Sequence, residues 1–212
     1  MIRKLIQYSF IIVIGATVFC SCDDEEDKIY SPKPRGYFRI DFPQKKYRPY
    51  DSISNFSFDI PEYSYMVQGK YKGDDTCWLN LEFPKYKATL NLTYRRVDGD
   101  LNSFLNDSRW YAIEHEKKAT GLDESPIIRD SAKVYGLVYD IAGNTASSVQ
   151  FYITDSTKHF MRGSLYFKCF PNTDSLKIVI DFIRKDILQL VKTCKWKEKE
   201  IPAKEIKKNK SV

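Results

Sequence analysis

The fold follows from residues 77–84, Cys77-Trp78-Leu79-Asn80-Leu81-Glu82-Phe83-Pro84, in which apolar and polar side chains alternate. Residues 88–94 repeat this alternation after a connection of only a few residues. A period of two is typical of a strand that buries one of its faces. Because short connections join antiparallel neighbours, we predict that these two strands form a β-hairpin.

The segment upstream of the hairpin shows the same pattern. Residues 35–43 place Tyr37, Arg39 and Asp41 on one face and three large apolar side chains on the other. Residues 56–60 alternate likewise, and residues 63–67 continue the pattern. We predict strands here. Proline ends the first two of them, as expected of a residue that cannot donate a ladder hydrogen bond.

Downstream of the hairpin the period changes to that of a helix. Asp98 or Asp100 can cap a helix that runs to about Ala119, with an apolar face interrupted by Ser108. Three predicted strands follow, at residues 133–141, 146–154 and 159–169. Their connections are short enough for hairpins, so the sequence predicts an antiparallel three-strand meander.

The last predicted helix begins at Thr173 or Asp174 and carries a long apolar stripe at helical spacing. The stripe consists of Leu176, Val179, Ile180, Ile183, Ile187, Leu190, Val191 and Cys194. We expect it to face the core. Strands in local hairpins with two long helices packed on them indicate an α+β fold with a mainly antiparallel sheet. This order of elements resembles the α/β/α sandwich of the PsbP and Mog1 families.

The N-terminal residues are typical of a bacterial lipoprotein signal. Two basic residues precede a short apolar run, and small Ser21 stands directly before Cys22. Cys22 is therefore the predicted lipid attachment site. Phe19 is bulky for the position three places before that cysteine, so an uncleaved anchor or a plain secretory signal is the alternative. Cys20 fits less well as the lipid acceptor, because Phe19 would then occupy a small-residue position.

The remaining chain divides by composition. We predict a signal peptide at residues 1–21, an acidic, proline-containing tether at 22–34, a single α+β domain at 35–195 and a Lys-rich disordered tail at 196–212. The acidic run of the tether is either a solvated linker or a sorting signal. The tail is either solvated or attracted to anionic lipid head groups.

Charge and motifs exclude several functions. Residues 23–194 hold 25 basic and 25 acidic side chains, which argues against nucleic acid as a partner. His115 and His159 lack metal-ligand spacing, so we predict no metal. The sequence contains neither a G-x-S-x-G motif nor a P-loop, so we also predict no cofactor, no small-molecule substrate and no enzymatic activity. Cys77, Cys169 and Cys194 either include one disulfide or serve as buried apolar residues.

Tyrosine is concentrated in the N-terminal half. Eight of the fifteen tyrosines lie between residues 30 and 86, in a segment also rich in Arg, Lys and Pro. Tyr and Arg are enriched at protein interfaces. The possible docking surface consists of Arg35, Tyr37, Arg39, Asp41, Tyr63 and Tyr65. The alternative is that these tyrosines fill the second face of the sheet beneath a helix.

Several motifs resemble the gliding-motility lipoprotein family GldD. They include Pro32-Lys33-Pro34-Arg35-Gly36-Tyr37-Phe38-Arg39-Ile40-Asp41-Phe42-Pro43, residues 56–61 and 77–84, Gly143-Asn144-Thr145-Ala146, and the run from Thr154 to the last helix. The lipid cysteine belongs to the same pattern. The resemblance implies a membrane-anchored, non-enzymatic component of the gliding machinery, linked to type IX secretion. It carries no catalytic residues over to this chain.

We therefore expect a scaffold or adaptor in the cell envelope that binds other gliding or secretion proteins. It would be held at the membrane through Cys22 and would face the periplasm, on the inner or the outer membrane. The alternative function, from another class, is a surface-exposed lipoprotein that binds glycan through exposed aromatic side chains.

Overall fold

The computed structural model describes residues 39–51, 55–69, 76–116, 119–169 and 173–197; Cys22, Arg35 and Tyr37 lie outside them. The fold belongs to the second of two compact units, Ile40–Val212. The strands are β1 Tyr47–Asp51, β2 Phe56–Pro61, β3 Tyr65–Gln68, β4 Thr76–Phe83, β5 Ala88–Arg96, β6 Gly121–Arg129, β7 Val134–Ala142, β8 Val149–Thr154, β9 His159–Phe167 and β10 Lys195–Trp196. The helices are α2 Leu101–Glu116 and α3 Thr173–Thr193, with short 3₁₀ turns at Pro84–Tyr86 and Asp130–Ala132.

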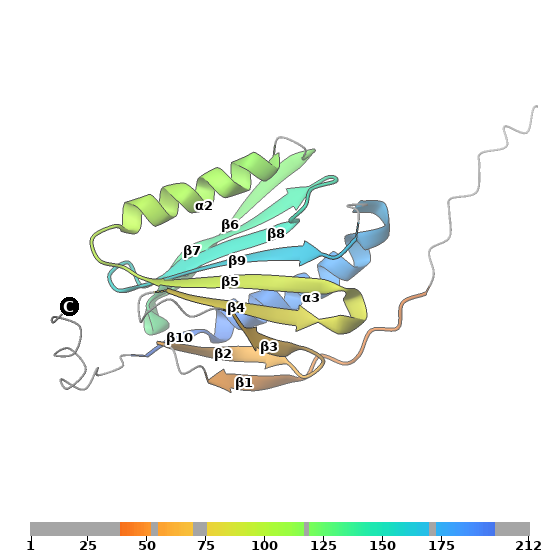
Figure 1. The fold of residues 1–212 in the computed structure, drawn as a ribbon, viewed down its shortest axis with the longest axis horizontal. Helices are drawn as coiled ribbons and strands as arrows, with labels where there is room; N and C mark the ends of the chain where they lie inside the picture. Colours follow the sequence, from red (N-terminus) through yellow and green to blue (C-terminus); the bar gives the residue numbers. More distant parts are fainter. Residues whose placement is uncertain (1–38, 52–54, 70–75, 117–118, 170–172, 198–212) are drawn as a thin grey trace, which may run out of the picture. The chain divides into compact units, whose positions relative to one another are not determined.

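The strands form two antiparallel sheets. Seven of them make one sheet in the order β3-β4-β5-β9-β8-β7-β6, and β1, β2 and β10 make a second one. Figure 1 shows α2 and α3 on opposite faces of the larger sheet. The predicted α+β class with a mainly antiparallel sheet is confirmed. The likeness to the PsbP and Mog1 families stays a prediction.

The predicted hairpin is confirmed as β4 and β5. Leu81 lies opposite Leu90, and Phe83 lies opposite Ala88. The 3₁₀ turn Pro84–Tyr86 connects the two strands, and Lys87 closes it in the left-handed conformation with φ 48°. Strand β5 then pairs with β9 along its whole length, so this hairpin occupies one half of the larger sheet.

The predicted meander is present as β7, β8 and β9, but the sequence reasoning missed a fourth strand, β6. Strand β6 lies at the edge of the sheet and pairs only with β7. An edge strand needs few buried apolar side chains and tolerates a proline, here Pro126 opposite Leu137. Its polar sequence therefore gives little alternation for a sequence-based prediction to detect.

The strand predicted at residues 35–43 is wrong for its described part. Residues 39–46 form no strand, and the first strand is β1, which the sequence reasoning did not predict. Of the predicted apolar side, Phe42 packs on a helix instead of joining a sheet, and Ile40 is exposed. The ring of Phe42 stacks on Phe182 of α3, with 4.3 Å between centroids, and the Nζ of Lys85 donates to the carbonyl of Asp41 at 2.6 Å.

The main core lies between the larger sheet, α3 and the small sheet. It includes the inward face of the hairpin, the aromatic residues of β2, and Val179, Ile183, Ile187 and Leu190 of α3. The predicted apolar stripe of the last helix thus faces the core. Complete burial of each such side chain stabilises the fold by about 1.5–3 kcal/mol.

The chain continues past α3 into β10, where the sequence reasoning expected the tail to begin. Lys195 and Trp196 pair with Ser57 and Phe56 of β2, so the pairing extends the small sheet. The ring of Trp196 stacks on His159, with 5.1 Å between centroids. A strand of two residues has no period that a sequence pattern could reveal.

Candidate docking surface

A buried carboxylate joins the N-terminal segment to α3. Asp186 accepts hydrogen bonds from the Nζ of Lys45 at 2.7 Å, the hydroxyl of Tyr47 at 2.9 Å and the hydroxyl of Tyr63 at 2.6 Å. Lys45 also donates to the carbonyl of Phe182 at 2.8 Å. The Nζ of Lys45 also lies 3.3 Å from the centroid of the Phe182 ring and makes a cation–π contact with it. We call these residues the Asp186 cluster.

Burial dominates the electrostatics of the Asp186 cluster. It lowers the pKa of Lys45, and the hydrogen bond from Lys45 to Asp186 offsets only part of that shift. Burial, followed by the hydrogen bond to Asp186, raises the pKa of Tyr63 well above its ordinary value. Each donor already has an acceptor inside the cluster. The arrangement therefore fixes the chain before β1 against α3, which is a structural role.

The second face of the larger sheet is only partly covered. Helix α2 packs over β7, β8 and β9 through Phe104 and Ala112, while the β3–β4–β5 half of this face carries no helix. Tyr65, Val67 and Trp78 lie on the uncovered half with exposed fractions of 50%, 40% and 38%. Tyr65 and Val67 lie opposite Glu82 and Asn80, the residues that alternate with the buried positions of β4, so all of them share one face.

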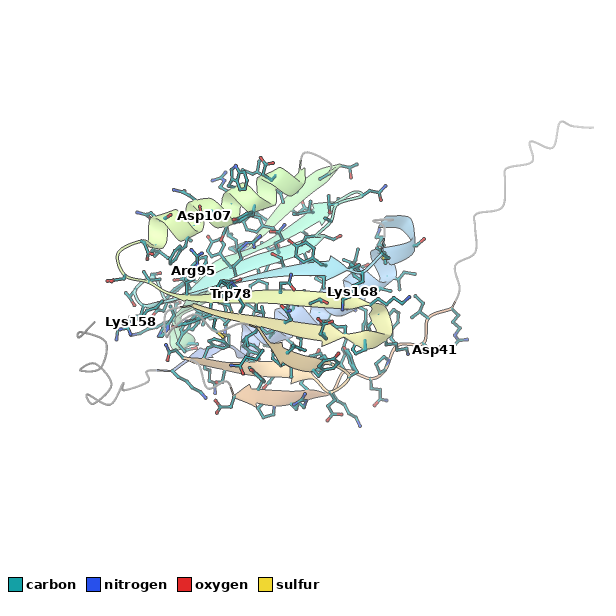
Figure 2. All side chains as sticks on the ribbon, in the orientation of Figure 1. Asp41, Trp78, Arg95, Asp107, Lys158 and Lys168 are labelled. Carbon is teal, nitrogen blue, oxygen red and sulfur yellow. The ribbon has the colours of Figure 1, made fainter. Side chains whose placement is uncertain are left out.

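A cleft of about 220 Å³ separates α2 from this half of the sheet. The sheet contributes Trp78, Arg95 and Arg162 to its lining, and α2 contributes Ser108 and Tyr111. Figure 2 labels Asp107 on α2, with Arg95 and Trp78 on the strands beside it. The cleft opens beside Trp78, so it adjoins the apolar surface formed with Tyr65 and Val67. We call the cleft and these three side chains the open face.

Aromatic rings position the two arginines of the cleft. The guanidinium of Arg162 lies 4.6 Å from the ring centroid of Tyr111, and that of Arg95 lies 4.9 Å from Phe104. The Nη2 of Arg162 donates to the Oε1 of Gln150 at 2.6 Å. Burial lowers the pKa of Arg162. Among the residues that the structure describes, no carboxylate forms an ion pair with either arginine.

The residues of the predicted docking surface are not all brought together. Arg39 and Asp41 are exposed in the segment before β1. Tyr63 lies in the Asp186 cluster and packs on Phe182, whereas Tyr65 lies on the open face. Tyr63 lies in the turn after Pro61, whereas Tyr65 begins β3, so the two tyrosines belong to no common strand. The docking role of the six predicted residues stays a prediction.

Sequence reasoning missed most of the open face. Trp78 carried a signal, because a large aromatic side chain occupies the polar side of an alternating strand. Arg95, Tyr111 and Arg162 carried none, because they come from three elements far apart in the sequence.

The cysteines and His159 form no catalytic or metal-binding site among the described residues. Within the described ranges, Cys77, Cys169 and Cys194 form no disulfide with one another. Cys77 and Cys194 are buried, as in the apolar alternative, and Cys169 is exposed. His159 is buried and its Nδ1 lies 2.8 Å from the hydroxyl of Tyr94, so it is a satisfied core histidine. No group of three or more His, Cys, Asp or Glu in the described ranges could hold a metal ion.

The fold and this surface define an α+β domain with one open sheet face beside a cationic cleft. The chain belongs to the gliding motility lipoprotein GldD family, because the sequence model of that family matches residues 27–196. Family membership implies a lipid-anchored protein of the cell envelope that interacts with other motility proteins there. It gives no support to the glycan-binding alternative. No curated protein matches the sequence. Neither helix in the described ranges is long and apolar enough to cross a membrane.

Proposed function

We propose that this protein is a lipid-anchored adaptor of the gliding machinery that binds another envelope protein through its open face. The observation that carries the proposal is the uncovered half-sheet, on which three large side chains stay exposed beside a polar cleft. Contiguous exposed apolar surface on a folded domain marks interaction sites, and aromatic side chains and arginine are the residues that dominate binding energy there.

The anchor and the surface serve different purposes in this proposal. Cys22 holds the protein at the membrane, and the acidic tether at residues 22–34 separates the domain from the anionic head groups. The open face then meets its partner in the periplasm. The family's place in gliding motility supports this arrangement, and the link to type IX secretion is part of the same proposal.

The test replaces Trp78 and Tyr65 by alanine in the chromosomal gene. We expect colony spreading and secretion of type IX substrates to fall, while the amount of lipidated protein stays unchanged. The matched control is Ile178→Ala, because Ile178 is 51% exposed on α3 and lies outside the open face. Normal spreading and secretion in the Trp78/Tyr65 double variant would refute the proposal.

Orientation is tested separately with protease added to intact cells. A protein that faces the periplasm is protected until the outer membrane is permeabilised. Digestion of the protein on intact cells would contradict the periplasmic orientation. The adaptor role would then still be judged by the spreading and secretion of the Trp78/Tyr65 variant.

A further inference from the structure

The cleft of the open face holds a partly buried arginine, Arg162, that forms no ion pair with a described carboxylate. Arg162 is half-buried; in the described part of the chain it donates a hydrogen bond to the amide of Gln150 and makes a cation–π contact with the ring of Tyr111. Burying a charge is unfavourable unless an opposite charge and hydrogen bonds compensate it. The guanidinium has five N–H donors, and one hydrogen bond to Gln150 leaves most of them available.

Buried hydrogen-bonding groups without partners gather around the same arginine. The Oγ of Ser108, the Nε2 of Gln150 and the Oγ of Ser164 have no partner among the described residues, and these side chains are 3%, 1% and 2% exposed. Ser108 lines the cleft, Gln150 contacts Arg162, and Ser164 lies opposite Gln150 in the β8–β9 ladder. All three groups can donate, and an acceptor bound in the cleft would pair with Ser108, the one of the three that lines it.

The charges of the cleft restrict which acceptor fits. Arg95 and Arg162 are positive and Asp107 is negative, which leaves one net positive charge in the lining. One charge matches a single carboxylate, and Asp107 would repel a polyanion such as a phosphate chain. The volume of about 220 Å³ is below the roughly 300 Å³ at which small-molecule pockets begin, so one side chain fits better than a free ligand.

We propose that the cleft binds the carboxylate of an Asp or Glu side chain in an extended segment of the partner protein. The carboxylate accepts from Arg162, which can engage it through two N–H groups, and from Ser108. Apolar neighbours of that acidic residue in the partner lie on Trp78, Tyr65 and Val67. This inference rests on the proposed adaptor function, because it names the chemistry that the open face recognises.

In the direct test, the full lipidated chain in detergent is titrated with the peptide acetyl-Gly-Phe-Glu-Phe-Gly-amide. Binding is measured from the NMR chemical shifts of the arginine side chains. The matched probe replaces Glu by Gln, and inorganic phosphate is a third. We expect the Glu peptide to bind at least about tenfold more tightly than the Gln peptide. Equal binding of the two peptides, no binding of either at millimolar concentration, or tighter binding of phosphate would overturn the inference.

Two variants and a control assign the effect to the cleft. Arg162→Gln should abolish the preference for Glu over Gln, and Ser108→Ala, which removes only one buried hydroxyl, should reduce it several-fold. Arg48→Gln changes an exposed arginine of β1, outside the cleft, and should leave the preference intact. If Arg162→Gln fails to fold, Ser108→Ala decides the question: an unchanged preference in that variant counts against the site.

A cellular comparison separates this inference from the adaptor proposal. If Trp78→Ala abolishes spreading while Arg162→Gln does not, the carboxylate site is refuted and the adaptor role stands. If neither variant affects spreading, both are refuted. Loss of spreading in both variants, with the loss of peptide preference in Arg162→Gln, supports both.

Discussion

We predict that loss of the Asp186 carboxylate destabilises the folded domain. Replacing Asp186 by alanine removes the acceptor that Lys45, Tyr47 and Tyr63 share, at distances of 2.6–2.9 Å. Asp186 is almost completely buried, whereas the Lys45 side chain keeps 25% of its surface exposed. The substitution therefore leaves a lysine charge and two hydroxyl donors in a partly dry site, without the carboxylate that compensated them.

The expected loss of stability is about 3 kcal/mol. Removing one partner of a fully buried ion pair costs roughly 3–5 kcal/mol. The lower end of that range applies because Lys45 still reaches solvent and retains the carbonyl of Phe182 as an acceptor. For a domain of this size, 3 kcal/mol corresponds to a fall in melting temperature of roughly 6–12 °C.

Urea unfolding followed by circular dichroism measures the loss. The control is Asp181→Ala, which changes an exposed carboxylate on the same helix and should alter stability by less than about 0.5 kcal/mol. The double variant Lys45→Met/Asp186→Leu replaces both charges by apolar groups and should be more stable than Asp186→Ala. A loss below 1 kcal/mol in Asp186→Ala, or a double variant less stable than Asp186→Ala, would refute the reasoning.

Three further predictions concern single residues. Gly136→Ala should destabilise the domain by at least about 2 kcal/mol in urea unfolding, because the added Cβ would lie 1.9 Å from the backbone carbonyl oxygen of Tyr152. In native protein, Cys169 should react with a maleimide while Cys194 does not, because burial raises the pKa of Cys194 to about 12; mass spectrometry distinguishes the two. Because the folded state raises the pKa of Tyr63, its contribution to stability is complete below about pH 10 and is lost as the pH rises further, so Tyr63→Phe should flatten the fall of the urea midpoint above pH 10.

Elements with a strong local period were predictable. The alternation in residues 77–94 specified β4 and β5, and the apolar stripe from Val179 to Val191 specified the buried face of α3. In both cases the buried residues recur at a fixed interval, two positions in the strands and three or four in the helix. The polar edge strand β6 and the two residues of β10 lack such a period, and only their pairing partners make them strands.

The same alternation in residues 39–43 was misleading for a physical reason. Phe42 buries its ring against Phe182, which lies on a helix 140 positions later in the chain. A side chain that packs on a helix and one that packs beneath a sheet are equally apolar. The local pattern therefore identifies the residue that is buried and leaves its partner unspecified.

The α+β class, the hairpin and the helices could be predicted from the order of residues alone, and the predicted membership of the GldD family is confirmed. The surfaces and clusters of the domain became evident only in the folded chain. In the folded chain Tyr63 donates to Asp186, whereas Tyr65 is exposed on the open face. Arg95, Tyr111 and Arg162, which are far apart in the sequence, line one cleft. The spacing of apolar residues predicts which residues are buried, because the buried positions of a strand or helix repeat at a fixed interval along the chain. Sites formed between distant elements leave no such repeat, because the distances that define them exist only after the chain has folded.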